Sequence, residues 1–254
     1  MCVCLRGRRP LNARERDSVD LPSFDLCSQQ AAWLRGARSR LLRRAQIERR
    51  EVIVELGAGW GIVANEWCVR TGRRVTALDR RPRPTGIDLH SHVDWLVGRA
   101  EELPLADRSV DLVFAQFTMM WLDAARAIAE ITRVLAPGGV LAVIEPDYGG
   151  LMEYPEEIAT RQIWMDGLRR AGADPCVGRK LPMLFASAGL RVETRFPDRY
   201  ELARPARLDL LAELHLTVDE RRQIDGIRDR LDGQHDISVA HLPLWMVLGV
   251  KASE

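Results

Sequence analysis

The stretch EVIVELGAGWG, residues 51–61, joins a short apolar run to three glycines at alternate positions. The run is rich in β-branched residues, which is typical of a strand buried on both faces of a parallel sheet. Glu55 stands near its end, and Gly57, Gly59 and Gly61 follow. Glycine lets a backbone approach a ligand closely and adopt positive φ. The stretch therefore predicts a strand followed by a ligand-binding loop, with a simple tight turn as the alternative.

Strands and helices alternate after this loop. Residues 62–72 have a helical pattern closed by Gly72, and residues 123–135 have one that stops before Pro137-Gly138-Gly139, a strong turn signal. Further apolar runs of strand length occupy residues 74–79, 94–98, 110–115 and 140–146. This alternation predicts an α/β fold with a mostly parallel sheet and right-handed crossovers.

The pattern is less regular after Pro146. Helices are expected at residues 155–172, 178–189 and 218–233, the last of them polar and exposed, and strands at residues 190–196 and 241–251. In a fold of this kind, the region 148–238 could build a lid over a substrate.

The N-terminal residues are polar and rich in arginine. We expect residues 1–27 to form a flexible arm, and they lack the apolar segment of a signal peptide. A basic helical pattern follows at residues 27–46. Its arginines could bind RNA, but lysine occurs only at Lys180 and Lys251, so the arginines reflect the composition of the whole chain and a solvated face is the simpler interpretation.

Charge and cysteine content limit the class of protein. The net charge is +1, which provides no overall field to attract nucleic acid or an anionic membrane. No apolar run is long enough to span a bilayer. The cysteines are odd in number and scattered, without a Cys-x-x-Cys pair: Cys2, Cys4, Cys27, Cys68 and Cys176. This argues against a disulfide scaffold or a structural zinc site and predicts a cytoplasmic protein.

A second carboxylate accompanies the glycines. Asp79 ends the second strand, 22 residues after Gly57, where it could accept hydrogen bonds from a ribose diol. These two features leave a choice between a dinucleotide and a smaller nucleoside ligand. The spacing Gly-x-Gly-x-Gly differs from the dinucleotide pattern Gly-x-Gly-x-x-Gly, and the absence of a following Lys-Ser or Lys-Thr excludes a triphosphate-binding P-loop.

Four motifs, VELGAGWG, ALD, GRAEELPLADRSVDLV and RVLAPGGVLAVIEPD, occur in this order. In this the chain resembles class I S-adenosylmethionine (SAM)-dependent methyltransferases of the small-molecule branch, similar to those of quinone biosynthesis. The resemblance implies a Rossmann-like fold, with a mostly parallel seven-stranded sheet, helices on both faces and an α-helical cap. It implies a methyltransferase domain over residues 28–254, with a SAM-binding core at about 50–147 and a cap with the last strands at about 148–254.

The resemblance also assigns roles to matching positions. The three glycines would pass under the methionine portion of SAM, Glu55 would meet its ammonium group, and Asp79 would hold the ribose hydroxyls. Glu101 would lie near the adenine amine, although Arg99 stands where the family usually has an acidic residue. The expected cofactor-binding residues are Glu55, Gly57, Ala58, Gly59, Trp60, Gly61, Asp79, Arg80, Ala100, Glu101, Gln116 and Phe117.

Catalytic candidates are less defined by the sequence. Tyr148 and Asp147 follow the fifth strand at the functional edge, and His215 lies in the expected lid; each could serve as a base if the acceptor arrives protonated. An apolar acceptor pocket could draw on Met119, Met120, Trp121, Trp164 and Trp245. His90 and His92 have no third fixed ligand beside them, so no metal is expected.

The predicted function is methyl transfer from SAM to O, N or C of a small organic molecule. Three rivals stay open: a non-catalytic SAM-binding or scaffold protein, an RNA or protein methyltransferase, and a nicotinamide-dependent oxidoreductase. The glycine spacing and the lack of a Tyr-x-x-x-Lys pair count against the oxidoreductase. A small-molecule methyl acceptor is the expected partner, neither membrane nor nucleic acid is expected, and a homodimer is compatible with this interpretation.

Overall fold

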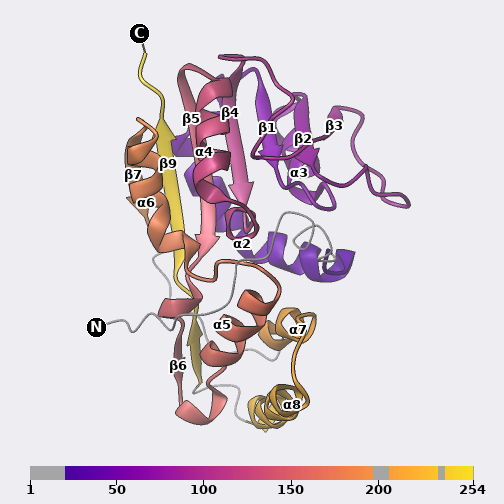
Figure 1. The fold of residues 1–254 in the computed structure, drawn as a ribbon. Coiled ribbons are helices and arrows are strands. Elements are labelled where there is room, and N and C mark those ends of the chain that lie inside the picture. The colour runs from indigo at the N-terminus through magenta and orange to yellow at the C-terminus, as the bar shows by residue number, and fades with distance from the viewer. Residues whose placement is uncertain (1–20, 197–205, 234–237, 254) are drawn as a thin grey trace.

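A seven-stranded sheet forms the centre of the computed structural model, which describes residues 21–196, 206–233 and 238–253 (Figure 1). Its strand order is β3-β2-β1-β4-β5-β9-β7. The first five strands pair in parallel, whereas β9 is antiparallel to both β5 and β7. The strands are β1 (Ile53–Leu56), β2 (Val75–Asp79), β3 (Val93–Val97), β4 (Val110–Gln116), β5 (Leu135–Pro146), β7 (Arg191–Arg195) and β9 (Leu244–Val250). The predicted seven-stranded, mostly parallel sheet is confirmed.

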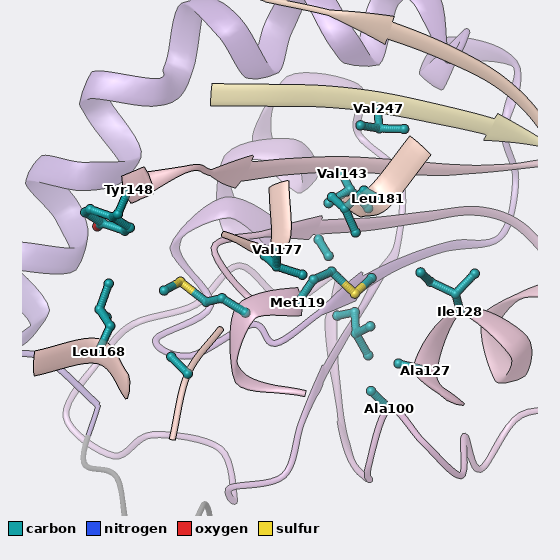
Figure 2. Packing of buried hydrophobic residues seen from close by; sticks show 14 of the residues in the cluster. Ala100, Met119, Ala127, Ile128, Val143, Tyr148, Leu168, Val177, Leu181 and Val247 are labelled. Carbon is teal, nitrogen blue, oxygen red and sulfur yellow. The ribbon is translucent and has the colours of Figure 1, made fainter. Parts of the chain in front are cut away.

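Helices cover both faces of this sheet. Helices α2 (Phe24–Arg44) and α3 (Ile62–Thr71) pack on one face, and α4 (Ala124–Val134) and α6 (Val177–Ser187) pack on the other. The alternation of side chains along β4 shows how one strand serves both layers. Leu112 and Phe114 join the hydrophobic cluster of α2 and α3, whereas Val113 joins the cluster of α4 and α6. Figure 2 shows part of this second cluster, with Val143 and Val247 of the sheet near Leu181 of α6.

A cap lies beyond the carboxyl ends of the parallel strands, at the bottom of Figure 1. It contains α5 (Arg161–Arg170), α7 (Arg207–Ala212), α8 (Val218–Gly233) and a two-stranded sheet of β6 (Met152–Tyr154) and β8 (Val239–His241). Short 3₁₀ helices connect the elements: η1 (Ile47–Arg49), η2 (Met119–Trp121), η3 (Tyr148–Gly150) and η4 (Glu156–Ile158). The prediction of a polar, exposed helix at α8 was wrong in part, because Ile224, Ile227 and Leu231 are buried in the same hydrophobic cluster as α4 and α6.

Several boundaries differ from the predicted ones. The turn expected at Pro137-Gly138-Gly139 lies inside β5, where Gly138 has a φ of +73° and the pairing with β4 shifts register. The strand expected at 241–251 divides, because residues 239–241 pair with β6 in the cap instead of with β5. The helix expected at 155–172 divides into η4 and α5.

The N-terminal prediction is covered only in part by the structure. Residues 1–20 of the expected arm lie outside the described residues. Helix α2 begins at Phe24, before the predicted end of the arm at residue 27. The Ser23 side chain accepts a hydrogen bond from the Leu26 N–H at 3.4 Å and caps the helix. None of the helices in the described parts of the chain is long and apolar enough to cross a bilayer.

Candidate functional site

A cavity of about 430 Å³ opens at the carboxyl ends of β1, β2 and β4, between the sheet and the cap. Its volume is in the range of roughly 300–1,000 Å³ found for small-molecule sites. The position agrees with the rule that open α/β sheets bind ligands beyond the carboxyl ends of their strands. The cavity is lined by all the predicted cofactor residues except Gly61: Glu55, Gly57, Ala58, Gly59, Trp60, Asp79, Arg80, Ala100, Glu101, Gln116 and Phe117.

The glycine loop lines the cavity with bare backbone. Gly57 has a φ of +71°, and a Cβ there would lie 2.4 Å from the Thr118 side chain, so only glycine fits. Gly59 has a φ of +56°, and a Cβ there would lie 3.3 Å from Leu21 of the N-terminal segment. Gly61 is different, because a Cβ there would meet Leu89 at 3.0 Å in the core and not the cavity. The predicted ligand role of Gly61 is therefore not supported by its position.

Glu55 combines two tasks at the end of β1. Its side chain lines the cavity although the residue is only 4% exposed. Oε2 accepts a hydrogen bond from the Ala64 N–H at 2.7 Å, in the first turn of α3. Burial raises the pKa of the Glu55 carboxyl to about 8, against the opposing effects of the Ala64 hydrogen bond and the nearby Arg38. A cation entering the cavity would favour the charged form of this carboxyl.

Asp79 holds the loop and faces the same cavity. Its Oδ2 accepts a hydrogen bond from the Gly59 N–H at 2.8 Å, and its Oδ1 accepts one from the Arg81 N–H at 2.9 Å. The residue is 6% exposed. A carboxylate has about four acceptor positions, so two backbone donors leave room for ligand hydroxyls.

The end of β4 brings Gln116 and Phe117 to the cavity. Phe117 has a φ of +52°, a conformation that is uncommon for a side chain of this size. Its ring makes an edge contact with Trp33 of α2, with ring centroids 6.2 Å apart. The Gln116 Oε1 accepts a hydrogen bond from Arg38 Nη1 at 3.0 Å. Strained backbone of this kind persists where surrounding contacts hold it, and here it lies beside the cavity.

Ala100 and Glu101 line the cavity after β3. Glu101 Oε1 accepts a hydrogen bond from the Asp123 N–H at 3.3 Å, and its Oε2 lies 3.9 Å from Arg99 Nε. Arg80 and Arg99 also line the cavity. The arginine at position 99, where the family usually has an acidic residue, is therefore an ion-pair partner of Glu101.

The cap side of the cavity is mostly apolar. Tyr148 and Trp164 stack there with ring centroids 4.7 Å apart and 28° between planes. Figure 2 shows Tyr148 above Leu168 at this end of the cluster. The remaining apolar lining residues on this side are Met120, Trp121, Leu122, Leu168, Ala171, Leu210 and Leu214. Of the other predicted acceptor residues, Met119 is fully buried in the core and Trp245 packs against Phe196, so neither lines the cavity.

The three catalytic candidates are not brought together. Tyr148 lines the cavity, and its burial, followed by the nearby Glu145, raises the pKa of its hydroxyl well above the usual range. His215 is exposed at the cavity wall. Asp147 does not line the cavity, and its Oδ2 accepts a hydrogen bond from Arg179 Nε at 2.6 Å. The structure therefore separates Asp147 from the predicted site.

Sequence reasoning missed Glu145, a fully buried carboxyl at the end of β5. Its Oε1 accepts hydrogen bonds from the N–H groups of Thr118 and Met119, at 2.6 and 2.7 Å. Burial raises the pKa of this carboxyl to about 8. Its position in the run VLAVIEP, directly after apolar residues, was the signal that could have revealed it, as it did for Glu55.

The N-terminal segment was also missed as part of the site. Leu21 and Pro22 line the cavity, together with Cys27, Gln30 and Ala31 of α2. The Trp60 Nε1–H donates a hydrogen bond to the Pro22 carbonyl at 2.8 Å, which holds this segment over the glycine loop.

The structure also bears on the question of a metal. Among the described residues no group of His, Cys, Asp and Glu side chains could hold a metal ion. His90 and His92 instead contact each other, since His90 Nδ1 accepts from the His92 N–H at 3.1 Å.

Residues 54–143 match the family model described as "Methyltransferase domain". The chain is 39% identical over 132 residues to the ubiquinone/menaquinone biosynthesis C-methyltransferase of Rubrivivax gelatinosus, covering 50% of this chain and 49% of the relative. It is 33% identical over 146 residues to the malonyl-[acyl-carrier protein] O-methyltransferase of Serratia marcescens, covering 56% and 55%. The chain thus spans about half the length of these curated relatives.

One solved structure extends the likeness beyond the matched region. The phosphoethanolamine N-methyltransferase 2 of Haemonchus contortus superposes with a TM-score of 0.55 at 16% identity, covering 80% of this chain and 49% of that chain. At this identity the likeness shows the fold alone. The fold is the Rossmann-like class I methyltransferase fold.

Proposed function

We propose that the protein transfers a methyl group from SAM to O, N or C of a small organic molecule, and the match of residues 54–143 to the methyltransferase-domain model supports this proposal. One observation carries the proposal. A single cavity joins a polar half, at the ends of β1, β2 and β4, to an apolar half under the cap. The first half suits a charged nucleoside cofactor, and the second suits a partly apolar acceptor.

The residues present fit this cofactor. Glu55 offers a buried carboxyl to an ammonium group, and burial alone makes that carboxyl costly to ionise until a cation arrives. Asp79 offers its remaining acceptor positions to ribose hydroxyls. Ala100 and Glu101 would border the adenine, and the bare backbone of Gly57 and Gly59 leaves space for the methionine portion.

When bound, SAM supplies a methyl group on a cationic sulfonium that a neutral nucleophile can attack in line. The protein then has to orient the acceptor and exclude water, and orientation alone can provide about 7–11 kcal/mol of barrier lowering. The stacked Tyr148 and Trp164 give the acceptor half a flat, dry wall. Because its pKa is raised, the Tyr148 hydroxyl stays protonated and serves as a hydrogen-bond donor. His215, which lines the cavity wall, is our candidate to take a proton if the acceptor carries one.

Thermal unfolding with added ligands tests the cofactor half. S-adenosylhomocysteine (SAH), SAM and NAD are added separately, each at about 100 times the expected dissociation constant. A specific ligand at this excess adds about 2.7 kcal/mol and should raise the midpoint by roughly 5–10 °C. We expect a rise with SAH and SAM and none with NAD. A rise with NAD alone would support an oxidoreductase, and no rise with any of them would contradict the proposal.

Methyl transfer needs a second assay. Radiolabelled SAM is incubated with the protein and pools of small phenols, amines and carboxylic acids, and the formation of SAH is followed. Turnover with one pool supports an enzyme acting on small molecules. Tight SAH binding without turnover in any pool or on RNA and protein extracts would favour a non-catalytic SAM-binding protein.

The domain limits, location and assembly are part of the same proposal. We assign the methyltransferase domain to residues 28–254, with the core at about 50–147 and the cap after it. Cys27, Cys68 and Cys176 are free thiols, which supports a reducing, cytoplasmic location. A homodimer is the assembly to test, and light scattering after gel filtration would distinguish it from a monomer.

A further inference from the structure

Arg38 is a fully buried cation on the apolar face of α2. Its side chain has no exposed surface, and its neighbours along that face are Leu34, Ala37, Leu41 and Leu42. A buried charge costs several kcal/mol to desolvate, and an apolar side chain of similar length would avoid this cost. A buried arginine at this position is therefore not explained by its contribution to stability, and its contacts suggest another role.

Those contacts lead to the cavity. Arg38 Nη2 pairs with the Glu66 carboxylate of α3. Arg38 Nη1 donates to the Ala31 carbonyl at 3.1 Å and to Gln116 Oε1 at 3.0 Å. Gln116 lines the cavity, whereas Arg38 does not. Gln116 is thus a cavity-lining side chain that Arg38 holds directly by a hydrogen bond, and the charge of Arg38 also acts on the nearby Glu55.

The pairing determines which way the Gln116 amide points. A guanidinium has donors and no acceptor, so the amide oxygen must face Arg38 and the NH₂ group must face away from it. Among the described residues none accepts a hydrogen bond from Gln116 Nε2. The adjacent positive charge also polarises the amide and makes its N–H groups better donors.

Glu55 lies close to this amide. β1 and β4 are neighbours, with Glu55 paired to Phe114, so Glu55, next to the end of β1, and Gln116, at the end of β4, come from adjacent strands and both line the cavity. One offers a carboxylate and the other an N–H donor. Together they complement the two charges of an amino-acid group, an ammonium and a carboxylate.

We propose that Arg38 is a positioning residue that fixes Gln116, so that its Nε2 donors bind the carboxylate of the cofactor's amino-acid arm. This inference rests on the proposed function. It also extends the cofactor site beyond residues 54–143, since Arg38 lies outside the matched family region.

Calorimetric titration with two ligands tests the proposal. SAH carries the amino-acid arm, whereas 5′-methylthioadenosine has the same adenosyl thioether without it. Gln116→Leu should weaken SAH binding about tenfold or more and change methylthioadenosine binding less than twofold. Arg38→Met should likewise weaken SAH binding and leave methylthioadenosine binding nearly unchanged. Arg43→Met, at an exposed position on the same helix, is the matched control and should leave both affinities unchanged.

A double-mutant cycle tests whether Arg38 acts through Gln116. The combined variant should bind SAH no more weakly than the worse single variant, because the second change has nothing left to remove. If Arg38→Met does not fold, Arg38→Lys replaces it in the cycle. Lysine keeps the positive charge but lacks the planar guanidinium with its several N–H donors.

The outcomes separate the two proposals. A wild-type protein that binds neither ligand overturns the proposed function and this inference with it. If the wild-type protein binds SAH, two results would overturn this inference and leave the proposed function standing. The Gln116 and Arg38 variants could lose affinity for SAH and methylthioadenosine equally, or they could keep the affinity for both. Additive losses in the cycle would also overturn it, because they would mean that Arg38 and Gln116 act separately.

Discussion

Replacing Asp79 with asparagine tests the ribose role of this carboxylate. In the structure both of its oxygens accept backbone N–H groups, from Gly59 at 2.8 Å and Arg81 at 2.9 Å. Asparagine has nearly the same shape but keeps only one oxygen and removes the charge. The NH₂ group would face either a backbone N–H or a ligand hydroxyl.

The magnitude follows from the number of bonds affected. A hydrogen bond to a charged group is worth about 1.5–3 kcal/mol, and 1.4 kcal/mol corresponds to a factor of about ten. Losing one such bond to a ribose hydroxyl should therefore weaken SAH binding roughly 10- to 150-fold. One backbone donor is also left without its acceptor, which costs about 1–3 kcal/mol of unfolding free energy and lowers the midpoint by roughly 2–12 °C.

Calorimetric titration of SAH, at a temperature well below the midpoint of the variant, separates affinity from stability. Asp88→Asn is the matched control, because Asp88 is exposed in the segment after the same strand. It should leave both the affinity and the midpoint unchanged. An Asp79→Asn variant that binds SAH within twofold of the wild type would refute the ribose role, whatever its midpoint.

Three further predictions follow from burial and backbone geometry. SAH affinity should rise from about pH 6 to 8 as the Glu55 carboxyl, whose pKa burial raises to about 8, becomes charged; Glu55→Gln should flatten this calorimetric profile. For Glu145, also with a pKa near 8, the folded chain keeps a proton that the unfolded chain releases above about 4.5. The unfolding free energy should therefore fall by up to about 1.4 kcal/mol per pH unit between these values, and Glu145→Gln should reduce that slope in urea titrations. Gly57→Ala should lower the free energy of unfolding by about 2–5 kcal/mol, because alanine is strained at positive φ and its Cβ would clash with Thr118. Adding Thr118→Ala should restore part of this stability in thermal melts.

Each of these can fail in a defined way. An unchanged pH profile in Glu55→Gln would mean that this carboxyl does not meet the ligand cation. A stability that rises between pH 5 and 8 in the wild type but not in Glu145→Gln would reverse the sign argued for Glu145. If Thr118→Ala restores none of the stability lost in Gly57→Ala, the loss would come from the backbone conformation alone and not from the clash with Thr118.

Local patterns in the sequence were sufficient to predict the core of the fold. The run that contains Glu55 is a buried strand, and Gly72 closes α3 in the left-handed conformation with a φ of +68°. The five parallel strands lie where they were predicted, but the predicted alternation with helices fails in part, because in this described part of the chain no helix separates β2 from β3 or β3 from β4. Each of these features depends on residues close together in the chain, and their side-chain types are enough to predict them.

Features that depend on distant residues could not be predicted. Gly61 faces Leu89 in the core and not the cavity, and Leu89 is distant in sequence. The predicted strand at residues 241–251 divides because its first part pairs with β6. Arg38 resembles the other arginines of its helix in sequence, yet it is buried because Glu66 and Gln116 meet it there. Periodicity cannot reveal such a partner, since the contacts join three separate elements.

The N-terminal segment that lies over the glycine loop has a consequence for how such a protein can diversify. The walls of the cavity come from two sources, the family-matched residues 54–143 and flanking stretches at residues 21–31, 148–171 and 210–215. Substitutions in the flanks at residues 148–171 and 210–215 can reshape the apolar side of the cavity while the loop from Gly57 to Gly59, with residues 21–31 over it, stays unchanged. Related chains could therefore exchange acceptors while keeping one cofactor, and a fragment cut to the matched region would expose the cavity on two sides.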